Sequence, residues 1–148
     1  YTGEELFPYT TLFRSDTHET GVASLLIGKR TATGGNFQGV ATGAKLWYSG
    51  FNNPAIATAT IAPQLKAAVD WQLTAPRTSV VNHSWGTTPT SSDATRQRVG
   101  RVIDWAVNQG QTHVAAAGND GNTAGSGGNN TGNIAWPGYA YNAITVAT

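Results

Sequence analysis

Residues 114–121 read Val-Ala-Ala-Ala-Gly-Asn-Asp-Gly, a run of small apolar residues that ends in an Asn-Asp-Gly turn. A short apolar run bounded by turn residues is typical of a buried strand in a parallel sheet. Its alanine side chains indicate that another part of the chain packs close against this strand. A Gly/Asn-rich loop follows over residues 118–133. The stretch therefore predicts a buried strand that runs directly into a loop.

The segment before this strand has the apolar spacing of an amphipathic helix. Ser92 is the expected N-cap of that helix, and Gly110 stands where a C′ glycine belongs. A β-branched strand over residues 79–84 precedes it. The apolar positions follow the i, i+3, i+4, i+7, i+8 pattern that gives a helix one buried face: Val99, Val102, Ile103, Ala106 and Val107.

Helices and strands alternate along the rest of the chain. Residues 16–19 have the form of a capping box that opens a helix, and a second helix is predicted from Pro63 to just before Pro76. Short strands are predicted over residues 45–49 and 144–147. Strands separated by single helices imply parallel pairing with crossover connections. We therefore expect an α/β fold, three-layered, with helices on both faces of a mostly parallel sheet and truncated at both ends.

The composition excludes several classes of function. The chain has 148 residues, enough for one domain with a single core, and its formal net charge is only +1. It has no basic cluster of the kind that binds nucleic acid and no apolar run long enough to span a membrane. Cysteine is absent, which rules out a disulfide scaffold, a thiolate zinc site and a cysteine nucleophile.

The first fifteen residues are expected to be foreign to the protein. Residues 6–15 read Leu-Phe-Pro-Tyr-Thr-Thr-Leu-Phe-Arg-Ser, which matches, codon by codon, the translation of a common short-read sequencing adapter. A segment of this origin is left out of reasoning about the fold. We expect residues 1–15 to be non-native and residues 16–148 to be part of one catalytic domain.

Three segments resemble the subtilase family of serine proteases, in the order in which that family uses them. Residues 18–24, His-Glu-Thr-Gly-Val-Ala-Ser, are similar to the segment around the family's catalytic histidine, with Glu19 in place of its usual glycine. Residues 80–86, Val-Val-Asn-His-Ser-Trp-Gly, are similar to the strand that lines the substrate cleft. Residues 114–121 match the segment of the oxyanion asparagine. The resemblance covers residues 16–148 and implies a subtilisin-like fold.

The resemblance also implies roles for individual residues. His18 would be the general base, because a neutral imidazole can accept the nucleophile's proton, and Asn119 would donate to the oxyanion through its uncharged amide. Read singly, His18 is also compatible with an exposed helix histidine, Asn119 with a turn residue and Trp85 with a core residue. The order of the motifs favours the catalytic interpretation. The expected substrate-binding residues are Ser84, Trp85 and Gly86 at the cleft strand and Ala116, Ala117 and Gly118 around the primary pocket.

Two members of the expected triad have no counterpart in this sequence. The family order is Asp, His, Ser. Asp16 is too near His18 along the chain to orient its ring, no Gly-Thr-Ser occurs, and Ser126 lies in the glycine-rich loop. We therefore expect an inactive fragment of a secreted, monomeric serine endopeptidase that cleaves polypeptides by an Asp-His-Ser triad. The alternative is a subtilase-like module that binds peptides without cutting them.

No cofactor or metal is expected from the sequence. His83 and His113 lie within strands beside apolar neighbours and are interpreted as structural. Members of the family often bind calcium, but the chain has no dense group of Asp residues to hold such an ion. A nucleotide-binding domain would need a Gly-x-Gly-x-x-Gly turn between a strand and a helix, and the glycines of residues 118–132 lead into no predicted helix.

Overall fold

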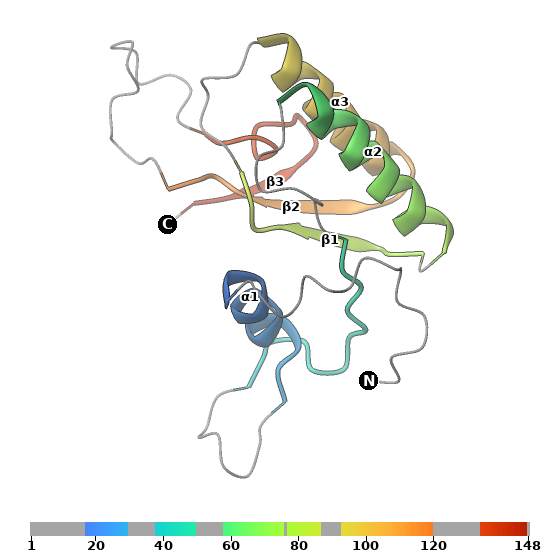
Figure 1. The fold of residues 1–148 in the computed structure, drawn as a ribbon. Coiled ribbons are helices and arrows are strands. Elements are labelled where there is room, and N and C mark those ends of the chain that lie inside the picture. The colour runs from blue at the N-terminus through green and yellow to red at the C-terminus, as the bar shows by residue number, and fades with distance from the viewer. Residues whose placement is uncertain are drawn as a thin grey trace. The chain divides into compact units, whose positions relative to one another are not determined.

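The computed structural model of the protein describes residues 17–29, 38–49, 58–75, 77–86, 93–119 and 134–147. The chain divides into two compact units, Tyr1–Asn52 and Asn53–Thr148. The first unit contains helix α1, and the second contains helices α2 and α3 and strands β1 to β3 (Figure 1). Each unit is described by itself.

Helix α1, Thr17–Ile27, forms where the capping-box pattern predicts a helix. The chain later returns to the C-terminal end of this helix. There the N–H groups of Val40 and Ala41 donate to the carbonyl oxygens of Leu25 and Leu26, at 3.0 and 2.7 Å. These bonds satisfy carbonyl groups that the last turn of a helix leaves without an intrahelical partner.

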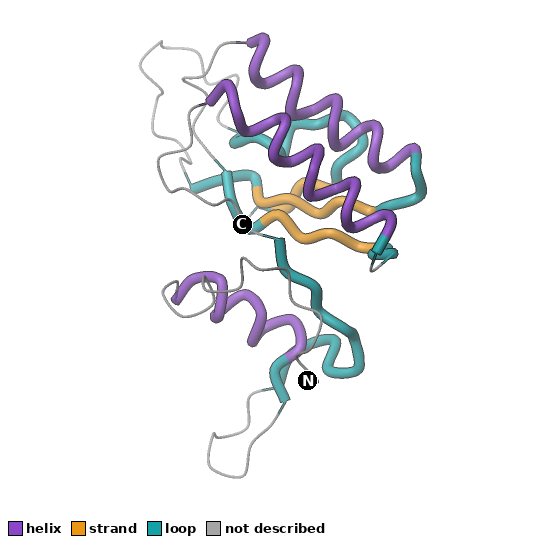
Figure 2. Tube along the Cα trace, turned by 45° about the vertical axis from the view of Figure 1, so that its right-hand side comes forward, coloured by secondary structure: helices purple, strands orange, loops and turns teal. Residues whose placement is uncertain are grey.

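A parallel three-stranded sheet forms the second unit. Its strands are β1, Val80–His83, β2, Thr112–Ala116, and β3, Ile144–Val146, in the order β1-β2-β3 (Figure 2). Both pairs of neighbouring strands are parallel. The parallel α/β fold expected from the alternation of helices and strands is therefore confirmed.

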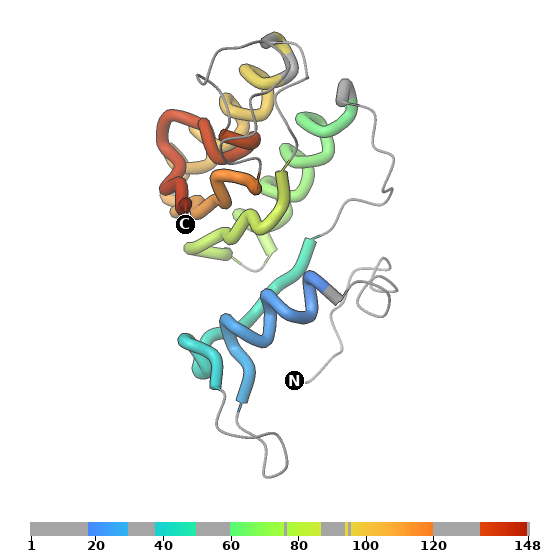
Figure 3. The backbone as a smooth tube through the Cα atoms, turned by 90° about the vertical axis from the view of Figure 1, so that its left-hand side faces the viewer, coloured from blue at the N-terminus to red at the C-terminus, as the bar shows by residue number. Residues whose placement is uncertain are grey.

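The two helices of this unit lie side by side on one face of the sheet (Figures 1 and 2). They are α2, Thr58–Thr74, and α3, Asp93–Asn108. The segment 134–147, red in Figure 3, lies beside α3 and β2, and its Asn142 N–H donates to Asp104 of α3 at 2.9 Å. The buried core between these layers comprises Ile61, Leu65, Val69, Val81, Val99, Ile103, Ala106, Ala115 and Trp136.

The prediction that the second helix starts at Pro63 was wrong. Helix α2 begins at Thr58, so Pro63 lies inside it. Proline lacks the N–H that bonds to the carbonyl four residues earlier, which is why the first turn is its usual place. Here the apolar face carries the helix past it, because Ile61, Ala62 and Leu65 are all buried.

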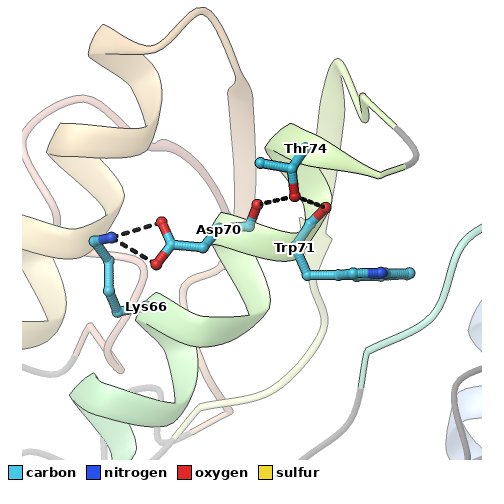
Figure 4. Close-up of polar contacts among 4 residues, drawn as sticks. All are labelled: Lys66, Asp70, Trp71 and Thr74. Atoms are coloured by element: carbon cyan, nitrogen blue, oxygen red, sulfur yellow. Dashed lines mark hydrogen bonds and ion pairs between the residues drawn. The ribbon is translucent and has the colours of Figure 1, made fainter.

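The solvent-facing side of α2 carries an ion pair one turn apart (Figure 4). The Lys66 ammonium lies 2.6 and 2.7 Å from the two carboxylate oxygens of Asp70. Lys66 also lies over the ring of Trp105 on α3, 4.0 Å from its centroid. At the end of the helix, the Thr74 hydroxyl donates to the carbonyl oxygens of Asp70 and Trp71. Lys66 thus links the exposed edges of α2 and α3.

Gly110 ends helix α3 as the sequence predicts. Its φ is 94°, a left-handed conformation that glycine adopts without steric cost. The Gly110 N–H donates to the carbonyl of Val107, and the Gln111 N–H donates to that of Ala106, at 2.9 and 3.2 Å. This pair of bonds is the Schellman cap. It delivers Gln111 to the start of β2 immediately after the helix.

The predicted strand over residues 45–49 is absent. These residues are described, and they form no ladder with another strand. The pattern Lys-Leu-Trp-Tyr-Ser has the apolar and aromatic content of a strand, but strand formation depends on the surroundings of a segment more than on its composition.

Candidate active site

The expected substrate-binding segments follow two adjacent strands. Residues 84–86 come directly after β1, and residues 117–119 come directly after β2. The register pairs His83 with Ala115, so the two strands end at nearly the same level. Because the carboxyl ends of parallel strands meet at one edge of the sheet, Asn119 and both segments come together there.

Ala135 fills the space between these two strand ends. A Cβ atom built on Gly86 would lie 2.9 Å from the Ala135 methyl carbon, and one built on Gly118 would lie 2.8 Å from it. Gly118 also has a φ of 102°. Both positions therefore require glycine. No role was predicted for Ala135 from the sequence.

Backbone hydrogen bonds hold the β2 end of the site on both sides. The Ala117 N–H donates to the carbonyl of Val146, and the Ala117 carbonyl accepts from the Ala135 N–H, at 2.8 and 2.7 Å. Gly118 and Asn119 are exposed directly after this anchored residue. The Asn119 amide is therefore accessible to a ligand at the surface and close to a fixed backbone.

Trp85 is half-buried, so it is neither a fully buried core residue nor a fully exposed one. Its indole N–H donates to Nδ1 of His83 at 3.2 Å. Its ring meets the ring of Trp136 edge-on, with centroids 6.0 Å apart and planes at 88°. Edge-to-face contact is a favoured geometry of aromatic pairs. Trp85 thus joins residues 84–86 to the 134–138 segment.

The two buried histidines of the sheet are neutral. Burial, and to a lesser extent the nearby His113, lower the pKa of His83 to about 3, whereas burial alone lowers the pKa of His113 to about 4. An imidazole that is removed from water loses the hydration that stabilises its charged form. The rings hydrogen-bond directly, with 2.8 Å between Nε2 of His83 and Nδ1 of His113.

His18 lies on the first turn of α1, in the other unit, and its side chain is exposed. The structure assigns no distance between His18 and Asn119. Asp16, Ser92 and most of the glycine-rich loop, including Ser126, lie outside the described residues. The expected site residues therefore form two groups. The cleft group, residues 84–86 and 117–119, lies within the second unit, and His18 lies on α1 in the first unit.

In the described part of the chain, no three His, Cys, Asp or Glu side chains are grouped so as to hold a metal ion. No helix of that part is long and apolar enough to cross a membrane.

Comparison with known proteins identifies the family. No protein with a curated description matches the chain. A solved structure described as the S41 psychrophilic protease matches with a TM-score of 0.60 and 29% identity, over 86% of this chain and 38% of that one. The chain thus spans well under half the length of that protease. The profile of the subtilase family matches residues 7–148, which include part of the segment predicted to be adapter-derived. The chain belongs to the subtilase family.

Proposed function

We propose that this chain is part of the catalytic domain of a secreted serine endopeptidase that uses an Asp-His-Ser triad. The observation that supports this most is the junction of residues 84–86 and 117–119 at one sheet edge, with Asn119 exposed beside it. Family membership supports the same assignment. The aspartate and the serine are supplied by parts of the protein that this sequence does not contain.

In the proposed reaction, the substrate backbone pairs with residues 84–86 as an added strand. The serine hydroxyl attacks the scissile carbonyl carbon, and His18 takes its proton as the C–O bond forms. The carbonyl oxygen becomes an oxyanion and accepts a hydrogen bond from the Asn119 amide. His18 then gives the proton to the leaving amine as the C–N bond breaks. Water releases the acyl group by the same steps.

The primary pocket is proposed to lie along the end of β2. Its walls would be Ala116, Ala117 and Gly118, which carry little side-chain volume and no charge. Ala135, which contacts the positions of both Gly86 and Gly118, would bound the same space. A lining of methyl groups and backbone favours an uncharged substrate side chain over a charged one, because an unpaired charge would be desolvated there.

A fluorophosphonate probe tests the proposal, because it labels only an activated serine. We expect the full-length protein to be labelled on a serine outside residues 1–148. The isolated 148-residue chain should remain unlabelled, since it lacks the nucleophile. Labelling of the isolated chain would contradict the proposed triad. A folded full-length protein that is unlabelled but binds peptides would favour the alternative, a catalytically dead peptide-binding module.

A further inference from the structure

A continuous chain of hydrogen bonds crosses β1 and β2 and ends at Trp85. The Trp85 indole N–H donates to Nδ1 of His83, and Nε2 of His83 lies 2.8 Å from Nδ1 of His113. Nε2 of His113 lies 3.2 Å from Oε1 of Gln111. The Gln111 amide nitrogen then donates to the carbonyl oxygen of Thr78 at 3.0 Å. Four side chains thus connect the backbone before β1 to the cleft strand after it.

The two ends of this hydrogen-bonded network determine which nitrogen of each imidazole carries the proton. An indole nitrogen can only donate, and a backbone carbonyl can only accept. Nδ1 of His83 must therefore accept, so that Nε2 carries the proton and donates to His113. The same logic places the proton of His113 on Nε2, facing Gln111. Each neutral imidazole is held in one tautomer by the hydrogen bond on its other nitrogen.

The rings of His83, His113 and Trp85 are closely packed as well as hydrogen-bonded. The rings of His83 and His113 lie nearly parallel, with centroids 5.1 Å apart and planes at 16°, and only 3% of His83 and none of His113 is exposed. His83 also meets Trp85 edge-on, with centroids 5.9 Å apart. A buried network in which every member is satisfied restricts its members to one arrangement. Trp85 is therefore held by both a directed hydrogen bond and ring contacts.

We propose that His83 and His113 are positioning residues that orient the indole of Trp85 and thereby set which substrate side chains the cleft strand accepts. The proposal rests on the proposed function. Trp85 lies at the centre of residues 84–86, the segment proposed to pair with the substrate backbone upstream of the scissile bond. A bulky ring fixed in one rotamer shapes the space beside it. The histidines act through Trp85, so their loss should change substrate preference more than the chemical step.

The first experiment reads the orientation of Trp85 without requiring catalysis. The indole ¹H–¹⁵N resonance of Trp85, assigned by its absence in Trp85→Phe, should be shifted downfield and protected from exchange in the full-length protein. His83→Leu removes the acceptor and should abolish both properties. His83→Asn is the matched control, because its amide oxygen can occupy the place of Nδ1 and should restore them. A Trp85 resonance that is the same in all three proteins would overturn the proposal.

The second experiment measures substrate preference with peptides that differ at one upstream position. His83→Leu should change the ratio of kcat/KM between aromatic and small side chains about tenfold, through KM, with His83→Asn closer to the wild type. In the Trp85→Phe background, His83→Leu should have little further effect on this ratio. An equal loss for all peptides, or an undiminished effect in that background, would contradict positioning through Trp85.

A third variant covers the case in which His83→Leu does not fold. His113→Leu removes the acceptor for the Nε2 proton of His83 while leaving the direct partner of Trp85 in place. It should weaken the protection of the Trp85 resonance, and His113→Asn should restore it. Unchanged protection in His113→Leu would contradict the proposal. If the wild-type protein cleaves no peptide, the resonance experiments still decide the positioning role while the proposed function fails.

Discussion

The cleft group of the second unit and His18 of the first unit are placed by different kinds of structure. Residues 84–86 and 117–119 are distant in sequence, and the pairing of β1 with β2 joins them. His18 is positioned by one helix, whose end is closed by residues that follow it. Substitutions at Gly86 and Gly118, which leave no room for a side chain beside Ala135, should therefore affect both the site and the stability of the fold. Substitution of His18 should affect catalysis alone.

The largest expected effect is that of His18→Ala in the full-length enzyme. Loss of the general base should lower kcat by about 10⁶-fold, a magnitude that comes from subtilisin, a member of the same family. The side chain is exposed, so the free energy of unfolding should change little. Kinetics with a chromogenic peptide and urea unfolding would measure the two effects. A kcat within tenfold of the wild type would exclude His18 as the base.

Asn119→Ala tests whether the cleft group takes part in catalysis. Removal of an oxyanion donor should lower kcat by about 10²–10³-fold with little change in KM, again a magnitude taken from subtilisin itself. Asn119 is exposed, and no backbone bond of the anchored residue Ala117 depends on its side chain. Asn119→Gln is the control, because it keeps the side-chain amide but places it one methylene group farther from the backbone. A change confined to KM would instead indicate a role in substrate binding.

Acid should destabilise the second unit through its buried histidines. Well above pH 6.5 both histidines are neutral in the folded and unfolded states, so they do not make the free energy of unfolding depend on pH. As the pH falls below 6.5, only the unfolded chain binds protons, until the folded pKa values of about 3 and 4 are approached. At pH 5 each histidine should lower the free energy of unfolding by about 2 kcal/mol.

His113→Asn is the variant that isolates this effect. It should reduce the loss of stability between pH 7 and pH 5 by about 2 kcal/mol, measured by urea unfolding at the two pH values. His18→Ala is the matched control, because it removes an exposed histidine of the other unit. An identical pH dependence in the wild type and His113→Asn would show that this histidine is not held neutral by the fold.

The smallest expected effect is at the surface of α2. Asp70→Asn removes the partner of Lys66 and should lower the free energy of unfolding by about 0.5 kcal/mol or less, because both side chains are partly exposed to solvent. Lys66→Gln also removes the cation above Trp105 and should cost about 0.5–1 kcal/mol more. Thermal unfolding in low salt would compare them. Equal losses would show that the contact with Trp105 contributes nothing.

The predictions from sequence succeeded where a local pattern was sufficient. Helix α3 follows its apolar spacing and ends at Gly110, and the strands predicted around residues 80–83 and 114–116 form the sheet. The start of α2 lies before the predicted one because Pro63, a favourable residue for a first turn, stands inside the helix. The strand predicted at residues 45–49 does not form, because strand formation depends on surroundings that composition does not specify.

The parts of the site that depend on register could not be predicted. His83 and His113 are thirty positions apart, and they meet only because Val81 pairs with His113 in the parallel ladder. The sequence predicts a structural role for each histidine singly, and it carries no sign of the contact between them. Ala135 likewise gains its place from contacts with Gly86 and Gly118 across the sheet edge. Spacing along one strand carries no information about these neighbours.

Gln111 forms structural hydrogen bonds through both its backbone and its side chain, and this constrains how the sequence of this region can vary among relatives. Its backbone completes the cap of α3, and its side chain accepts a hydrogen bond from His113 and donates one to the carbonyl oxygen of Thr78. Because the direction of donation is set at both ends, replacing one middle residue by a side chain that cannot both accept and donate leaves a buried donor or acceptor unpaired. We therefore expect positions 83, 111 and 113 to covary among close relatives, changing as a set.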